Sequence, residues 1–110
     1  MTEINEITRE IVDLSRELYG SLLNKILLYG SYARGDFNDQ SDVDIMIVLD
    51  CDDKDLKQYR KSTSRMASRV GLRNDVEVSL LLRDKKNFEA RQSILPFYDA
   101  VQREGVVLYG

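Results

Sequence analysis

The stretch that most constrains the fold of this chain is "LLYGSYARGDFNDQSDVDIMIVLD", residues 27–50. It lies across two apolar runs, at 25–29 and at 42–49, that are separated by a turn-rich segment. Short apolar runs bounded by turn residues are typical of buried strands. Successive side chains of a strand point to opposite faces, so alternate residues of the second run would face a core. That face would hold Val43, Ile45, Ile47 and Leu49.

Asp42 and Asp44 fall on the other face of this second strand. With a rise of about 3.3 Å per residue, their Cα atoms would lie about 6.6 Å apart. Two carboxylates this close repel each other unless water surrounds them or a cation lies between them. Mg²⁺ takes oxygen ligands and keeps substrate phosphates, and two such ions can hold the attacking and leaving oxygens of a phosphoryl transfer. The spacing therefore predicts a Mg²⁺ site, with two ions, on Asp42 and Asp44.

The connection between the two strands begins with residues suited to phosphate. Gly30 lets the backbone approach a ligand closely. The Ser31 hydroxyl and free backbone amides would offer hydrogen bonds to a phosphate. Arg34 lies near enough to pair with a phosphate oxygen. The alternative is that it is a solvated charge. The lysine-containing pattern of a Walker loop is absent from the sequence. A nucleoside triphosphate held over Mg²⁺ is the ligand that this combination predicts.

Apolar periodicity predicts the other elements. Before the first strand, apolar residues three and four apart indicate a helix over 3–19, capped by Thr2 and ended by Gly20. The elements expected later are an acidic capping connection at 50–55, a helix over 54–70, a break at 71–75, a strand over 76–82, helical segments at 84–91 and 96–104, and a short strand or extended tail at 105–109. This order predicts the α/β (α+β) class, with helices packed on a small mixed sheet in one domain over 1–110.

Charge and composition narrow the possible functions. The net charge is −3 and no dense Lys/Arg patch is present in the sequence, which argues against a long nucleic acid as partner. The sequence has no histidine, so its chemistry must use carboxylates, hydroxyls, backbone amides and arginines. No apolar run approaches the roughly 20 residues that span a bilayer. A polar N-terminus unlike a signal peptide and the single Cys51 lead us to expect a cytoplasmic protein.

The motif as a whole resembles a known family. Gly30-Ser31, ten further residues and then Asp42-x-Asp44 match the G-S-x10-D-x-D signature of the DNA polymerase β-like nucleotidyltransferase superfamily. The filled form, "GSYARGDFNDQSDVDIMIV", is similar to that of the minimal nucleotidyltransferases, the MNT group. The resemblance covers most of the chain, from the leading helix to the C-terminal "REGVVLY".

The resemblance implies a fold, a reaction and a partner. The fold would be the superfamily's catalytic palm without accessory domains. The reaction would move a nucleoside monophosphate, AMP if the nucleotide is ATP, to an acceptor hydroxyl with release of pyrophosphate. Gly30 and Ser31 would hold the triphosphate, and Asp42 and Asp44 would bind Mg²⁺. Members often pair with a small helical HEPN-type protein as antitoxin and toxin, and some antitoxins of this kind adenylylate a tyrosine on that partner.

The family also implies a third carboxylate on the next strand, where aspartate is usual. The candidates in "NDVEVSL" are Asp75 and Glu77, which would share a strand face. We favour Glu77 because it would lie between apolar residues inside the strand, as the family's acid does. A glutamate there could serve as a metal ligand or as a general base toward the acceptor hydroxyl. Its extra methylene puts the efficiency of transfer in question more than nucleotide binding.

Three other functions compete with protein adenylylation. The first is an antitoxin that neutralises its partner by contact alone, which the glutamate and the small size of the chain favour. The second is modification of a small molecule, for which related aminoglycoside enzymes use an additional domain. The third is polymerase or tRNA modification, which the acidic balance disfavours.

Overall fold

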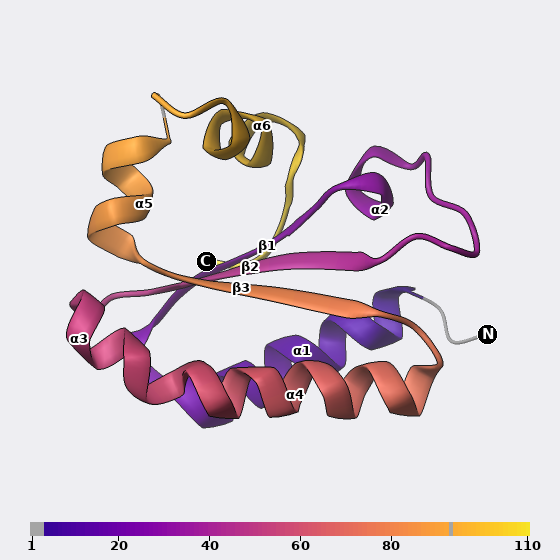
Figure 1. The fold of residues 1–110 in the computed structure, drawn as a ribbon, viewed down its shortest axis with the longest axis horizontal. Coiled ribbons are helices and arrows are strands. Elements are labelled where there is room, and N and C mark those ends of the chain that lie inside the picture. Colours follow the sequence, from indigo (N-terminus) through magenta and orange to yellow (C-terminus); the bar gives the residue numbers. More distant parts are fainter. Residues whose placement is uncertain (1–3, 93) are drawn as a thin grey trace.

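The computed structural model describes residues 4–92 and 94–110. Its centre is a four-stranded sheet in the order β3-β2-β1-β4 (Figure 1). The strands are β1 (Leu23–Tyr29), β2 (Val43–Leu49), β3 (Val78–Asp84) and β4 (Val106–Tyr109). β1 runs antiparallel to β2 and to β4, whereas β2 and β3 are parallel. The predicted mixed sheet is therefore confirmed, and the C-terminal residues form a strand rather than a loose tail.

Helices cover both faces of the sheet. The two long helices, α1 (Ile4–Tyr19) and α4 (Arg60–Asn74), lie side by side on one face (Figure 1). The shorter α5 (Lys85–Arg91) and α6 (Pro96–Glu104) lie on the other. The remaining turns are η1 (Gly20–Leu22), α2 (Ser31–Arg34), α3 (Asp53–Leu56) and η2 (Lys57–Tyr59). Among the described residues, no helix is long and apolar enough to cross a membrane.

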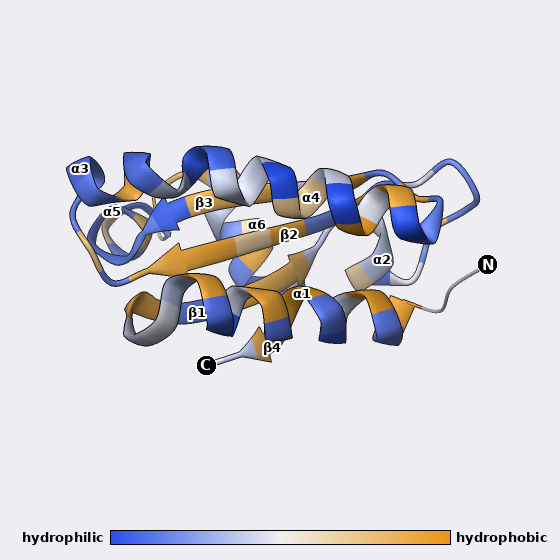
Figure 2. Cartoon of the chain, turned by 90° about the horizontal axis from the view of Figure 1, so that it is seen from below, coloured by the Kyte–Doolittle hydropathy of each residue, from blue (hydrophilic) through white to orange (hydrophobic). Residues whose placement is uncertain are grey.

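The strand β2 is buried on both sides, and Figure 2 shows that it is hydrophobic along most of its length. Val43, Ile45, Ile47 and Leu49 face the core under α1 and α4, as their alternation predicts. The opposite face is also a core, because Met46 and Val48 pack with Phe88 of α5 and Tyr98 of α6. Polar side chains are left accessible at the start of β2, where Asp42 lies just before the strand and Asp44 is its second residue.

The helix after β2 differs from its prediction over 54–70. It is built from α3, η2 and α4 in succession, and α4 continues to Asn74. The predicted break at 71–75 was wrong because Gly71 is a helical residue. A Cβ on Gly71 would lie 2.7 Å from the Val76 carbonyl oxygen, so glycine lets the following segment fold back against the helix. The chain turns instead at Asp75, whose φ is 53°.

The predicted caps have mixed outcomes. Asp52, in the acidic connection, accepts a hydrogen bond from the Asp55 amide at 2.8 Å and begins α3, as expected. Gly20 follows the end of α1 with a φ of +57°, which also agrees with the prediction. Thr2, the predicted cap of α1, lies outside the described residues.

Asp84 is a buried carboxylate that joins β3 to α5. Its side chain is 4% exposed and accepts hydrogen bonds from the Asn87 amide at 3.0 Å and from Asn87 Nδ2 at 2.8 Å. Burial by itself would raise the pKa of Asp84, but the hydrogen bonds from Asn87 outweigh it and lower that pKa below its ordinary value. The ionised form is therefore the one that stabilises the fold.

We expect Asp84→Ala to lower the free energy of unfolding by about 1–2 kcal/mol at pH 7, because α5 loses its cap. A depressed pKa stabilises the fold above the unfolded value of about 3.9, and this contribution disappears as the pH falls through the lower folded value. Urea unfolding between pH 7 and pH 2 should show the gap between wild type and variant closing in acid. Asp52→Ala, which removes an exposed cap, is the matched control and should lower the free energy of unfolding by less than Asp84→Ala does. A gap that widens in acid would contradict the assignment.

Candidate active site

The sequence GSYAR folds into a tight turn at the end of β1. Gly30 has a φ of +76°, and the Ala33 and Arg34 amides both donate to its carbonyl oxygen at 3.1 Å. A Cβ on Gly30 would lie only 2.5 Å from Oδ2 of Asp44. Glycine is therefore required here twice, once for the backbone conformation and once for the close approach of the carboxylate. The turn and the Asp42–Asp44 pair lie at the same edge of the sheet, as the sequence predicts.

Asp44 is a half-buried carboxylate beside a second one. It pairs with Tyr29 in the antiparallel register of β1 and β2. Burial and then the charge of Asp42 raise the pKa of Asp44, while Arg34 opposes the rise. The charge of Asp42 thus disfavours the ionised form of Asp44, which is the condition that a bound cation relieves.

Tyr29 lies next to this pair and is a site residue whose role the sequence did not reveal. Burial and then the charge of Asp44 raise the pKa of Tyr29 to about 12, with Arg83 opposing. Its ring meets that of Phe97 on α6 edge to face, with centroids 5.6 Å apart. The phenol therefore stays protonated at neutral pH. Its ring gives the site an apolar surface, and its hydroxyl is the one polar group of the side chain.

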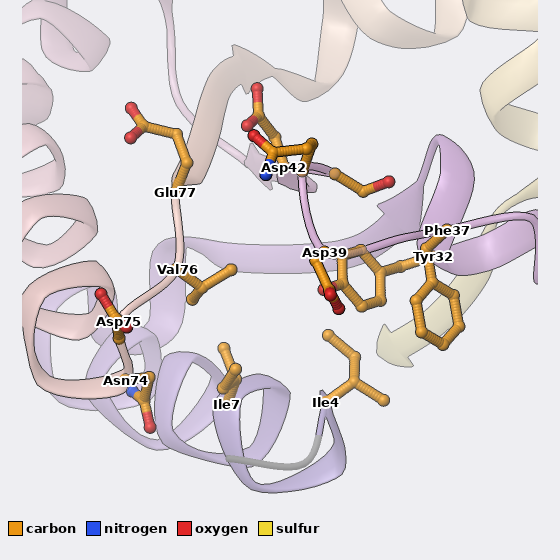
Figure 3. A pocket seen from close by; sticks show the side chains of 12 residues that line it. Ile4, Ile7, Tyr32, Phe37, Asp39, Asp42, Asn74, Asp75, Val76 and Glu77 are labelled. Carbon is orange, nitrogen blue, oxygen red and sulfur yellow. The ribbon is translucent and has the colours of Figure 1, made fainter. Parts of the chain in front are cut away.

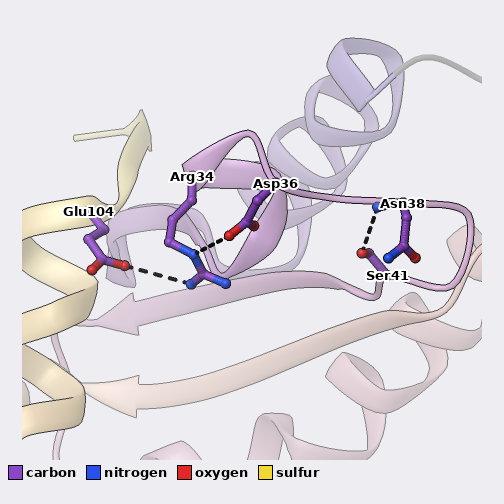
Figure 4. Close-up of polar contacts among 5 residues, drawn as sticks. All are labelled: Arg34, Asp36, Asn38, Ser41 and Glu104. Atoms are coloured by element: carbon purple, nitrogen blue, oxygen red, sulfur yellow. Dashed lines mark hydrogen bonds and ion pairs between the residues drawn. The ribbon is translucent and has the colours of Figure 1, made fainter.

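A cavity of about 380 Å³, which we call the turn cavity, opens between this turn and α6. Its lining includes Gly30, Ser31, Arg34 and Asp44 from the predicted motif and Phe97 and Glu104 from α6. Figure 4 shows Arg34 between two carboxylates. Its Nε lies 3.2 Å from Asp36 Oδ2, and its Nη1 lies 3.7 Å from Glu104 Oε2. Arg34 thus lies at the turn that the sequence predicts to bind phosphate, but its guanidinium is paired with acids in this structure.

Glu77 precedes β3 rather than lying inside it, so that part of the prediction was wrong. The Val76 amide still donates to the Gly71 carbonyl at the end of α4, and β3 begins only at Val78. Even so, the Val43 amide donates to the Glu77 carbonyl at 2.8 Å, so the parallel register sets Glu77 level with Asp42. Asp75, the other candidate, occupies the bend before it.

Asp42, Asp75 and Glu77 line a second cavity, of about 710 Å³, which we call the end cavity. Figure 3 shows Asp42 and Glu77 along its upper rim, with Ile4 and Ile7 of α1 across from them. Tyr32 and Phe37, from the turn and the loop after it, form a side wall by stacking on each other with centroids 4.4 Å apart.

The residues present suit Mg²⁺ in part. Asp42 and Asp44 supply two oxygen ligands whose mutual repulsion a cation would relieve. Across residues 4–92 and 94–110, however, no three acidic or other metal-binding side chains come close enough to form a site by themselves. Asp42 and Asp44 would hold the ion, and Glu77 would have to move closer to join them.

The family described as the nucleotidyltransferase domain matches residues 4–104. The chain belongs to this family. The predicted membership of a nucleotidyltransferase family and the predicted enzyme class, a nucleotidyltransferase, are both confirmed.

Two archaeal relatives are similar to this nucleotidyltransferase over almost their whole length. The "Putative protein adenylyltransferase MJ0141" of Methanocaldococcus jannaschii is 34% identical over 104 residues, which cover 94% of this chain and 97% of that protein. A second protein of that organism with the same designation, MJ0604, is 32% identical over 101 residues, which cover 92% of this chain and 93% of that protein.

Solved structures share the nucleotidyltransferase fold at lower identity. A toxin–antitoxin structure with AMP-PNP aligns with a TM-score of 0.59 and 23% identity, covering 94% of this chain and 73% of that chain. A complex of a tri-AMPylated Shewanella oneidensis HEPN toxin with its MNT antitoxin aligns with a TM-score of 0.53 and 21% identity, covering 96% and 71%. These likenesses confirm the predicted fold.

Glu104 is the wall residue of the turn cavity with the clearest expected effect on nucleotide binding. If this turn binds phosphate, as the sequence predicts, the carboxylate of Glu104 would repel the phosphate and compete for Arg34, with which it forms a partly exposed ion pair. We expect Glu104→Gln to tighten ATP binding about two- to fivefold, the range of exposed ion pairs, without a change in thermal unfolding. Equilibrium titration with ATP at low and high salt measures this, and the gain should shrink at high salt.

The control for this prediction is Asp99→Asn on the same helix. Asp99 pairs with Arg103 at 2.8 Å, so its substitution also removes an exposed ion pair of α6. It should leave ATP affinity unchanged. Weaker ATP binding by Glu104→Gln would mean instead that Glu104 holds Arg34 in a useful orientation.

Proposed function

We propose that this nucleotidyltransferase transfers AMP from ATP to a tyrosine hydroxyl of a HEPN-type partner, in a Mg²⁺-dependent reaction, and acts as the antitoxin of that partner. The observation that carries the proposal is Asp44, which lies against Gly30 of the turn and whose ionised form the neighbouring Asp42 disfavours. The designation of the archaeal relatives as adenylyltransferases supports AMP as the transferred group. The tri-AMPylated HEPN toxin bound to an MNT antitoxin supports the partner. The proposal places the reaction in the cytoplasm, where ATP is made and Cys51 would stay reduced.

Each site residue has a role in the proposed reaction. Gly30, Ser31 and Arg34 bind the triphosphate. Asp42 and Asp44 would hold Mg²⁺, which when bound would supply positive charge to offset the negative charge of the phosphates. The tyrosine oxygen forms a bond to the α-phosphorus, the bond from that phosphorus to the bridging oxygen breaks, and pyrophosphate leaves. Glu77 accepts the phenolic proton, which makes it the general base.

One observation favours a second candidate function. Within the described part of the chain, Glu77 does not join Asp42 and Asp44 in a three-carboxylate cluster. A palm with such an open site could neutralise its partner by binding alone. In that case Asp42→Asn with Asp44→Asn would leave neutralisation intact.

Label transfer from α-labelled ATP tests the proposed function. Purified protein, Mg²⁺ and a lysate of the source organism are incubated in parallel with the Asp42→Asn/Asp44→Asn variant. A discrete protein band labelled only by the wild type supports the proposal, and mass spectrometry of the band identifies the acceptor residue. ATP binding without any labelled protein, together with neutralisation by the double variant, would replace the proposal with the contact-only antitoxin.

A further inference from the structure

We propose that the end cavity is the acceptor pocket, and that it selects a tyrosine carried by a basic segment of the partner. The inference rests on the proposed function and adds the location of the acceptor, the residues that choose it and the charge of its surroundings. Phe37 and Ile4 would determine the preference for an aromatic ring, and Asp75 would favour basic neighbours.

The two cavities divide the predicted motif between them. The turn cavity takes Gly30, Ser31 and Asp44, whereas the end cavity takes Asp42 and Glu77. In phosphoryl transfer the attacking and leaving oxygens lie roughly in line on opposite sides of the phosphorus. With the leaving pyrophosphate at the Gly30–Ser31 turn, the attacking hydroxyl must arrive from the opposite side of the aspartate pair. β2 lies between β1 and β3 in the sheet, so that side is the one with Glu77.

The shape and lining of the end cavity suit an aromatic ring. Its volume of about 710 Å³ exceeds what one side chain needs. Ile4, Ile7 and Val76 give it apolar surface, and the stacked rings of Tyr32 and Phe37 give it an aromatic wall. Figure 3 shows Ile4 and Ile7 across the cavity from Asp42 and Glu77, with Tyr32 and Phe37 to one side. A phenol with its ring among the apolar groups would point its hydroxyl at Glu77.

The charge of the end cavity favours a basic segment. Four carboxylates line it, and none of its described lining residues is lysine or arginine. The acids are Asp39, Asp42, Asp75 and Glu77. Asp39 and Asp75 have no part in holding Mg²⁺, so their charge would still attract cationic groups when the metal is bound. Lysine or arginine beside the acceptor tyrosine would complement these acids and strengthen docking at low salt.

Peptide binding followed by NMR tests the pocket without relying on transfer. The probes are short amidated peptides with Lys-Tyr-Lys, Glu-Tyr-Glu or Lys-Ser-Lys at their centre, added to protein with Mg²⁺ and a non-hydrolysable ATP analogue. We expect Lys-Tyr-Lys to bind most tightly and to shift the resonances of Ile4, Ile7 and Phe37. Phe37→Ala should weaken its binding about tenfold, the lower range for lost apolar pocket contacts. The control is Val107→Ala, which shortens a side chain on β4 that is 57% exposed, and it should leave binding of Lys-Tyr-Lys unchanged.

Asp75→Asn provides a second, charge-specific variant. Asparagine tolerates the left-handed backbone at this position, so the fold should be retained. We expect this variant to reduce the preference for Lys-Tyr-Lys over Glu-Tyr-Glu by two- to threefold while the aromatic preference over Lys-Ser-Lys stays.

Other outcomes have definite meanings. If the nucleotide alone shifts Ile4 and Phe37 and the peptides do not bind, the end cavity holds the nucleoside and the inference is overturned. Equal binding of Lys-Ser-Lys and Lys-Tyr-Lys would overturn the aromatic preference. Tight binding of Lys-Tyr-Lys in the end cavity without any label transfer to a tyrosine protein would support the pocket and count against the proposed reaction.

Discussion

Asp44→Asn is expected to lower the rate of nucleotide transfer by about 10³-fold while the protein stays folded. A metal held at a phosphoryl group contributes several kcal/mol to the transition state, and about 4 kcal/mol corresponds to a thousandfold in rate. Asparagine keeps the shape of the side chain beside Gly30 but removes a charged ligand. Label transfer to the identified acceptor measures the rate, and circular dichroism checks the fold. Asp13→Asn, on the exposed side of α1, is the control and should transfer normally.

The same variant should be at least as stable as wild type at pH 7. Burial and Asp42 raise the pKa of Asp44, so its ionised form opposes folding. This penalty is absent in strong acid, where Asp44 is protonated in both states, and it appears as the pH rises through the ordinary value of about 3.9. In thermal melts from pH 3 to pH 7, the melting temperature of Asp44→Asn relative to that of wild type should therefore rise with pH. Mg²⁺ should stabilise wild type more than the variant. A variant that loses stability as the pH rises would contradict this account.

Gly30→Ala has the second-largest expected effect, because it acts on the backbone and on Asp44 together. The positive φ costs a non-glycine residue about 1–3 kcal/mol. The new methyl group would also lie 2.5 Å from Asp44 Oδ2, so the carboxylate must move. A displacement of about 1 Å in a reacting group is enough to cost roughly 10²-fold in rate. We expect a lower melting temperature and about a hundredfold slower transfer.

Gly20→Ala separates the two causes. Gly20 also has a positive φ, +57°, but a Cβ there meets nothing within 4 Å, and the residue lies at the far end of β1. Gly20→Ala should lose less stability than Gly30→Ala, because it adds no clash, and it should keep normal transfer. If both variants transferred equally well, the contact between Gly30 and Asp44 would have no part in the reaction.

The elements that define the site follow from short-range patterns. The alternation over 42–49 was sufficient to assign the faces of β2, and the spacing from Gly30 to Asp44 was sufficient to predict which turn meets which strand. Both features depend on residues close together in the sequence, because two antiparallel strands joined by a short connection have few ways to pair. The extent of α4 escaped prediction, since the role of Gly71 depends on a carbonyl five residues later that folds back onto it.

The sequence by itself determined the mixed sheet, the family and the acidic pair at the start of β2, because strand period, motif spacing and charge repulsion act over a few residues. Only the tertiary structure decided which other residues line the turn cavity and the end cavity. It brought Phe97 and Glu104 of α6 against the Gly30–Ser31 turn, and it set Glu77 before β3, level with Asp42. These contacts join segments dozens of residues apart through packing on a common sheet. Packing of this kind leaves no periodic signal in the chain.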